Sequence, residues 1–407
     1  MCGEAISERS LRHPGWRVVA VCFAVAIFSW GFAFYGHGVY LAELSRLHGW
    51  SAAAISGATT LSYLVSASLV IFVSDVLARF GPRRFLLLAI ACMAASAALL
   101  TTVTQIWHLM AVYVLMAFGW AGMGVAAITT ILGNWFGERR GLAISLALNG
   151  ASLSGVIFIP PLVALSGAYG FRPAMLTCTA IMLAVLLPMV VFLFPEGRRS
   201  DAPTGEGAGI LALPSWSKAQ ALLSWRFWSV TTPFALAIAA QAGFLVHQIA
   251  YMAPLIGREQ AALAVAVTTA CAVIGRLCLG FVIHRLDQRI VSAVSFASQT
   301  AALCVMAASD AAPVLLAACA VYGFSVGNII TLPALIIQRE FEPASFGAMV
   351  GLSTAVGQFI YAFGPGLLGV VKDASGGYTL PLILCGAFNL LAAIIILMRP
   401  RSTAASH

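Results

Sequence analysis

The chain has 407 residues, of which 61% are hydrophobic and only 9% are charged, and its mean hydropathy is +0.97. Soluble domains carry about 25% charged residues, so this composition excludes an ordinary soluble fold and predicts a surface that faces lipid. The net charge of +8 is divided among small groups between hydrophobic runs and forms no basic face, which excludes a nucleic-acid partner.

Twelve apolar runs follow one another along the chain, each near the length of about 20 residues that a helix needs to cross a bilayer. They predict an all-α membrane protein with twelve transmembrane helices. The first run follows Arg9, Arg12 and Arg17 and is too long for the hydrophobic core of a signal peptide, so we expect it to be retained. The predicted spans are residues 18–41, 53–73, 85–104, 108–132, 142–165, 173–194, 227–252, 261–283, 290–309, 312–335, 346–371 and 379–398.

The longest polar interruption between these runs is residues 196–226. It predicts a cytoplasmic linker, with a short surface helix around residues 216–223. The linker divides the chain into an N-terminal six-helix bundle, residues 1–195, and a C-terminal six-helix bundle, residues 227–407.

An internal repeat supports the division into two halves. At one offset of 206 residues, the segment Arg79–Arg83 falls on Arg285–Arg289, and Gly141 falls on Gly347. Two similar halves related by a pseudo-two-fold axis along the membrane normal are a transporter architecture.

The distribution of Lys and Arg predicts the orientation, since short cytoplasmic loops carry an excess of both. With the N-terminus inside, the cytoplasmic segments hold 17 of the 22 Lys and Arg residues and the external loops hold 4. We therefore expect both termini in the cytoplasm. A preference for Arg over Lys and alanine-rich spans are typical of a GC-rich bacterium, which predicts the bacterial inner membrane.

Several stretches resemble a known family. The loop Ser74–Arg84 resembles the loop 2–3 signature of the major facilitator superfamily. Residues 134–143, 275–280 and 346–366 resemble its monocarboxylate and oxalate–formate branch, so the resemblance extends over nearly the whole chain. It implies two six-helix halves that rock about a central site.

The resemblance also implies a gate on the cytoplasmic side, with one departure from the family pattern. The Asp of the signature is Ala78 here, whereas Asp75 lies one helical turn before Arg79, the spacing of an i, i+4 ion pair. We predict a hinge in this loop and gating roles for Asp75, Arg79, Arg83 and Arg285.

Arg276 is the one basic residue within a predicted span, and none of the fourteen acidic residues falls within one. An arginine at membrane depth costs about 2.5–3.5 kcal/mol on insertion scales, so it needs a partner. An anionic substrate is the natural one; the alternative is a structural arginine held by backbone carbonyls. In the resembling branch the arginine of span 8 binds the substrate carboxylate, and Arg276 matches it. A single cation favours a monoanion over a dianion.

Further polar side chains within the spans are predicted to line a central cavity. His37 and His247 lie in matching helices, and with an ordinary pKa of about 6.5 either histidine is able to carry a proton. The alternative is that both histidines are packing residues. The predicted substrate-binding set is Tyr35, His37, Asn149, His247, Gln248, Arg276, Gln358 and Tyr361.

The spans hold no nucleotide-binding motif and no constellation of catalytic side chains, so we predict neither an ATP-driven pump nor an enzyme, and no cofactor. The nine cysteines show no CxxC spacing, which favours buried hydrophobes over metal ligands. We predict a secondary active transporter that moves a small organic anion by alternating access, with proton coupling or exchange. The alternatives are a carrier or exporter of a vitamin, a drug or a metalloid, and a transporter-like membrane receptor.

Overall fold

The computed structural model describes residues 8, 10, 13–137, 139–194, 216, 218–329, 331–342 and 345–398. Within these ranges it contains twelve helical segments that are long and apolar enough to cross a membrane, and no strand. The predicted all-α fold with twelve transmembrane helices is therefore confirmed. Of the predicted linker, only residues 216 and 218–226 are described, and they include the short helix α11 (Lys218–Leu223).

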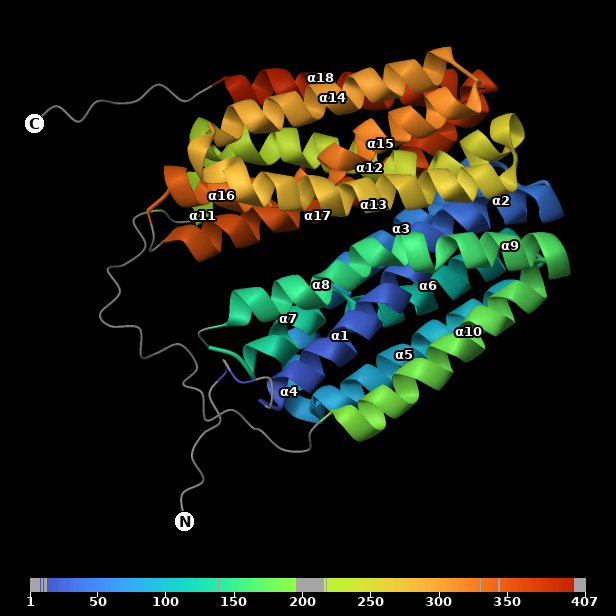
Figure 1. Cartoon of the computed structure of the whole chain (residues 1–407), viewed down its shortest axis with the longest axis horizontal. Coiled ribbons are helices and arrows are strands. Elements are labelled where there is room, and N and C mark those ends of the chain that lie inside the picture. Colours follow the sequence, from blue (N-terminus) through green and yellow to red (C-terminus); the bar gives the residue numbers. More distant parts are fainter. Residues whose placement is uncertain are drawn as a thin grey trace, which may run out of the picture.

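The remaining helices form two groups (Figure 1). The first group, blue to green in Figure 1, contains α1 (Gly15–Trp30), a π-helical turn (Gly31–Tyr35), α2 (Gly36–His48), α3 (Ala52–Val70), α4 (Val73–Phe80), α5 (Pro82–Leu99), α6 (Ile106–Met123), α7 (Val125–Gly133), α8 (Arg140–Ile157), α9 (Ile159–Tyr169) and α10 (Phe171–Pro188). The second group, yellow to red, contains α12 (Trp225–Ile256), α13 (Arg258–Val282), α14 (Gln288–Ala308), α15 (Ala312–Ile329), α16 (Leu332–Glu340), α17 (Phe346–Ser375) and α18 (Thr379–Leu397).

Local sequence signals explain several helix boundaries. The hydroxyl of Ser51 accepts a hydrogen bond from the backbone N–H of Ala54 at 3.2 Å and so caps the start of α3. The Asp287 carboxylate caps α14 in the same way, accepting from the Arg289 N–H at 2.9 Å. Gly257, between α12 and α13, has a φ of 86°, a conformation that glycine adopts without steric cost. These caps and turns let the chain reverse in very few residues.

The two groups meet mainly at one end of the molecule. We call this the α2/α9 end, because α2 and α9 finish there; the opposite end, with α4 and α16, is the α4/α16 end. Across the groups α3 packs on α17, α2 on α12, and α8 and α9 on α13. In Figure 1 the ribbons of the two groups converge toward the α2/α9 end on the right and diverge toward the α4/α16 end on the left.

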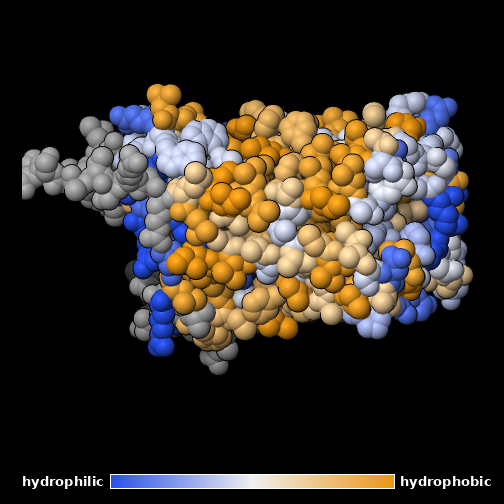
Figure 2. Space-filling view, turned by 90° about the horizontal axis from the view of Figure 1, so that it is seen from above, coloured by the Kyte–Doolittle hydropathy of each residue, from blue (hydrophilic) through white to orange (hydrophobic). Residues whose placement is uncertain are grey.

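The surface matches a membrane environment. Figure 2 shows a broad hydrophobic band on the face that it draws, with hydrophilic residues at both ends of the molecule. Large apolar side chains are exposed along the helices, including Phe192 at 81% and Phe281 at 77%. Exposed apolar area of this extent is stable in lipid and unstable in water.

Candidate functional site

Arg276 is held where α13 crosses α15 at close range. A Cβ atom added at Gly323 would collide with the backbone of Thr268, and one at Gly275 with the backbone of Phe324. Glycine at these positions lets the two helices approach closely. The approach brings the carbonyl oxygen of Gly327 to 3.4 Å from Nε of Arg276, which donates to it.

The Arg276 guanidinium keeps most of its hydrogen-bonding capacity. It carries five N–H donors, and the Gly327 carbonyl takes one of them at the long distance of 3.4 Å. The ion pairs between described residues are Glu43–Arg46, Glu43–Arg258, Arg289–Glu340 and Lys372–Asp373. None of these pairs includes Arg276. The hydroxyl of Tyr35, from the other helix group, is near enough to interact with the guanidinium electrostatically.

An aromatic stack joins the two groups. The ring of Tyr361 on α17 pairs with two rings of the first group, at 4.8 Å from Tyr63 and 6.3 Å from Phe34. Its interplanar angles of 30° and 14° are those of stacked rings. Tyr35, next to Phe34 in the chain, also interacts electrostatically with Tyr361. The structure thus brings together Tyr35, Arg276 and Tyr361 of the predicted substrate set.

Two other members of the predicted set lie on helices that pack across the two groups. Gln358 is exposed and lies one turn before Tyr361 on α17. Asn149 is half-buried on α8, a helix that packs on α13.

His247 and Gln248 lie inside the second group. Nε2 of His247 donates to the carbonyl of Pro365 at 3.0 Å, and Nδ1 lies 3.2 Å from the hydroxyl of Tyr378. Burial raises the pKa of the Tyr378 phenol, so its hydroxyl keeps its proton and donates to Nδ1. The amide of Gln248 donates to Thr268 at 3.1 Å. These hydrogen bonds connect both side chains to neighbouring helices and so stabilise the packing of the second group.

His37 lies inside the first group, in a ring of tyrosines. Its side chain is fully buried, and the rings of Tyr113, Tyr63 and Tyr40 have their centroids 4.9, 5.5 and 5.9 Å away. The ring nitrogens of His37 and the hydroxyl of Tyr40 have no partner in regular hydrogen-bond geometry, whereas the Tyr63 hydroxyl interacts with Tyr361 and the Tyr113 hydroxyl with Thr59. The structure therefore places the two predicted histidines in opposite chemical situations.

The residues predicted to form the cytoplasmic gate lie at the α4/α16 end. Asp75 and Arg79 are both exposed on α4, and no ion pair joins them; instead the Arg79 guanidinium lies 5.9 Å from the ring of Phe80. An exposed i, i+4 pair contributes only about 0.3–0.5 kcal/mol, which does not fix two long side chains. Arg83 is half-buried at the start of α5, and Arg285 is exposed after α13.

Three charged residues at the α2/α9 end join the two groups and were missed in the sequence. The Asp373 carboxylate, on α17, accepts from the backbone N–H groups of Ala52 and Ala53 at 3.3 and 2.7 Å and so caps α3 across the interface. Glu43, on α2, pairs with Arg258 on α13 at 3.1 Å. These contacts hold the groups together.

The prediction that no acidic residue falls within a span was wrong. The helices that contain two predicted spans continue past residues 41 and 371 to His48 and Ser375. Glu43 and Asp373 therefore lie within candidate membrane spans, near their ends, as do Glu259 and Glu340. Gly49, which ends α2 with a φ of 67°, and the capping Ser51 were the sequence signals that mark the true boundary.

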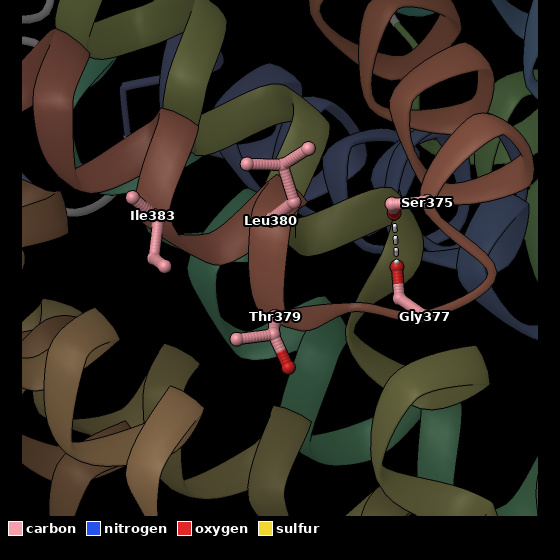
Figure 3. Close-up of a pocket in the computed structure, with 5 residues that line it drawn as sticks. All are labelled: Ser375, Gly377, Thr379, Leu380 and Ile383. Carbon is pink, nitrogen blue, oxygen red and sulfur yellow. Dashed lines mark hydrogen bonds between the residues drawn. The ribbon is translucent and has the colours of Figure 1, made fainter.

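A small surface pocket lies beyond Asp373, at the α17–α18 turn. Ser375, Gly377, Thr379, Leu380 and Ile383 line it, and the Ser375 hydroxyl donates to the Gly377 carbonyl at 3.1 Å (Figure 3). The lining residues carry no charge. Arg276 is not among the residues that line this pocket.

The twelve-span helical fold in two groups, together with the family match, makes this chain a multi-pass membrane transporter and not an enzyme. The model of the Major Facilitator Superfamily matches residues 19–262 and 256–407, and the chain belongs to this family.

Similar proteins share this assignment. The chain is 27% identical over 419 residues to Monocarboxylate transporter 11 of Homo sapiens, covering 95% of this chain and 83% of that protein. It is 24% identical over 392 residues to Monocarboxylate transporter 13 of Bos taurus, covering 95% and 89%. Its fold is similar to the crystal structure of a bacterial homologue of the human lysosomal transporter Spinster in an inward-facing, unoccupied conformation, with a TM-score of 0.75, 13% identity and coverage of 95% and 97%.

Proposed function

We propose that this protein is a secondary active transporter that moves a small organic anion with one carboxylate. The observation that carries the proposal is Arg276, a half-buried guanidinium within a membrane span that forms no ion pair with any described residue. Guanidinium binds carboxylate through two parallel hydrogen bonds, which supply charge compensation and orientation together. The names of the similar monocarboxylate transporters support the same substrate class.

The transport cycle that we propose is alternating access. The residues 1–195 and 227–407 are the two bodies that rock about Arg276 and the Tyr361 stack, and the Asp373 cap and the Glu43–Arg258 pair close one side. The gating roles of Asp75, Arg79, Arg83 and Arg285 belong to the opposite side.

We infer from the distribution of Lys and Arg that the α4/α16 end faces the cytoplasm of a bacterial cell, with both termini on that side of the inner membrane. The arginines of the predicted cytoplasmic loops, such as Arg79 and Arg285, lie at this end. With that orientation the structure is closed to the outside by the Asp373 cap.

Energy coupling follows from charge. An anion that enters alone against 100 mV, inside negative, costs about 2.3 kcal/mol per charge. Movement together with a proton, or exchange for another anion, removes that cost. We therefore propose proton coupling or anion exchange as the mode of transport.

A second candidate is a carrier or exporter of an amphipathic molecule such as a drug or vitamin. The stacked rings of Phe34, Tyr361 and Tyr63 favour it, because a flat apolar group is able to stack against such an aromatic surface. For such a substrate the carboxylate contact to Arg276 would be secondary to the aromatic one.

The purified full chain tests the proposal through ligand-induced stabilisation, because a ligand that binds the folded state raises the Tm. We expect lactate or pyruvate to raise the Tm of wild type and of Arg172→Ala, whose arginine is exposed at the start of α10. Arg276→Ala should show no rise. Equal stabilisation of the Arg276→Ala variant, or stronger stabilisation by oxalate than by every monoanion, contradicts a one-carboxylate site at Arg276.

A further inference from the structure

Two buried histidines lie in the spans, and only one of them has its ring nitrogens committed. Nε2 of His247 carries the hydrogen that it donates to the Pro365 carbonyl, which is an acceptor only, and Nδ1 accepts from Tyr378. This ring is fixed in one neutral tautomer. Any further proton would remove its bond from Tyr378.

His37 offers the reverse arrangement. We use the name tyrosine chamber for His37, Tyr40, Tyr63 and Tyr113. The two ring nitrogens of His37 and the Tyr40 hydroxyl are buried without a partner in regular hydrogen-bond geometry, and the backbone carbonyls of Ala33 and Phe34 interact with the ring. Buried polar groups are normally satisfied, so these atoms call for an explanation, and proton binding is one.

A line of tyrosines connects the tyrosine chamber to Arg276. Arg276 interacts electrostatically with Tyr35, Tyr35 with Tyr63, Tyr63 with Tyr113, and Tyr113 with Tyr40. Each hydroxyl donates one hydrogen bond and accepts others, so successive tyrosines are able to pass a proton when their hydroxyls align. The line begins at the proposed carboxylate site and ends beside the free nitrogens of His37.

The surroundings of His37 carry no fixed charge that would hold its protonation state. The titratable groups that face the tyrosine chamber are Tyr40 from α2, Tyr63 from α3, Tyr113 from α6 and Cys178 from α10, beside Tyr40. All are neutral near pH 7. Burial of the ring favours its neutral form, so protonation of His37 needs a compensating negative charge, which a carboxylate at Arg276 would supply.

We propose that His37 is the proton-binding group of the transport cycle. A proton from the aqueous phase adds to the lone pair of a ring nitrogen to give imidazolium, and the same proton leaves to the other aqueous phase when the substrate is released. The imidazolium charge and the substrate carboxylate cancel, so the loaded protein moves no net charge. This inference rests on the proposed function, since it needs an anionic substrate at Arg276.

Reconstituted full-length protein tests the inference by comparing two readouts with labelled lactate. One is counterflow without a pH gradient, and the other is accumulation driven by an inward proton gradient. A gradient of about one pH unit corresponds to about 1.4 kcal/mol, or about tenfold accumulation, when one proton moves with each anion. We therefore expect His37→Gln to lower the ratio of driven accumulation to counterflow about tenfold, and Tyr113→Phe to lower it less. The matched control is His108→Gln, a histidine at the start of α6, which should keep the wild-type ratio.

Each outcome decides between the two proposals. A wild-type ratio in folded His37→Gln overturns the role of His37, and so does a wild type that exchanges lactate but ignores the proton gradient. A wild type that exchanges no carboxylate contradicts the proposed function instead.

Nitrogen NMR of labelled histidine in the solubilised chain, with the His37 signal assigned from its loss in His37→Gln, gives an independent decision. With saturating lactate the His37 signal should titrate between about pH 5 and pH 8, because the bound carboxylate compensates the imidazolium charge, and the His247 signal should not. A His37 signal that stays constant over that range contradicts proton binding.

Discussion

At the scale of single residues, Arg276 and Asp373 show how a charged group is used at membrane depth. Arg276 has one long hydrogen bond to a backbone carbonyl and no ion pair with a described residue, so its charge is available. The Asp373 carboxylate has two backbone N–H partners at a helix start, which stabilise negative charge. Arg276 is therefore able to bind a ligand, whereas Asp373 stabilises a closed interface between the two groups.

The substitution Arg276→Lys separates charge from geometry. Lysine keeps the positive charge but lacks the planar pair of donors that matches a carboxylate. We expect the dissociation constant for lactate to rise about tenfold, which corresponds to about 1.4 kcal/mol, and calorimetry on the purified protein measures it. Unchanged affinity in Arg276→Lys would mean that the arginine acts as a charge alone.

At the scale of helices, the α13–α15 crossing determines where Arg276 lies. The close approach depends on Gly323, because a Cβ atom at this position would collide with the backbone of Thr268. A backbone atom, unlike the end of a flexible side chain, is not able to move aside. Packing against backbone leaves no room for a larger residue.

Gly323→Leu is therefore expected to destabilise the protein by about 1–3 kcal/mol, the usual cost of overpacking. The matched control is Gly351→Leu, since a Cβ at Gly351 meets nothing within 4 Å. Thermal unfolding in detergent should show a lower Tm for Gly323→Leu alone. Equal Tm values for the two variants would contradict the close crossing.

The cap of α3 by Asp373 predicts a change in conformational populations. Asp373→Asn removes the charge at the helix N-terminus, which contributes up to about 1 kcal/mol, so the open population at the α2/α9 end should rise up to about fivefold. Spin labels at Leu47 and Gln260, both exposed at this end, report the change in a variant without native cysteines. Asp310→Asn, at an exposed position of the same end, is the control. Identical distance distributions in both variants would show that the cap does not stabilise closure.

Sequence patterns predict the number of membrane helices well. They predict poorly where each helix ends and which charged residues pair across the two groups. Apolar runs of membrane length predict twelve spans because lipid exposure requires them, and the described part of the chain has twelve candidate spans. The roles of Glu43 and Asp373 depend on a few residues of helix beyond the apolar run and on a partner more than 200 residues away, which hydropathy does not report. His37 and His247 look alike in sequence. Only their tertiary contacts show that the ring of His247 is hydrogen-bonded to Pro365 and that the ring nitrogens of His37 lack a partner in regular geometry.

At the scale of the whole molecule, the two helix groups contact each other mainly at the α2/α9 end, and the membrane orientation decides which compartment the site meets. We predict that green fluorescent protein fused after His407 fluoresces in bacteria and that alkaline phosphatase fused there is inactive, because the excess of Lys and Arg places this terminus in the cytoplasm. An active phosphatase fusion would show that the orientation is the opposite one. The Asp373 cap would then close the cytoplasmic side.

The most direct test of the whole account is counterflow of labelled lactate in proteoliposomes, with wild type, Arg276→Ala and the exposed-arginine control Arg172→Ala. The account predicts exchange by wild type and by Arg172→Ala, and a loss of about a hundredfold or more in folded Arg276→Ala, because a charge-assisted pair contributes about 3 kcal/mol. Exchange by Arg276→Ala at the wild-type rate, or no exchange of any carboxylate by a folded wild type, would contradict an organic-anion transporter built around Arg276.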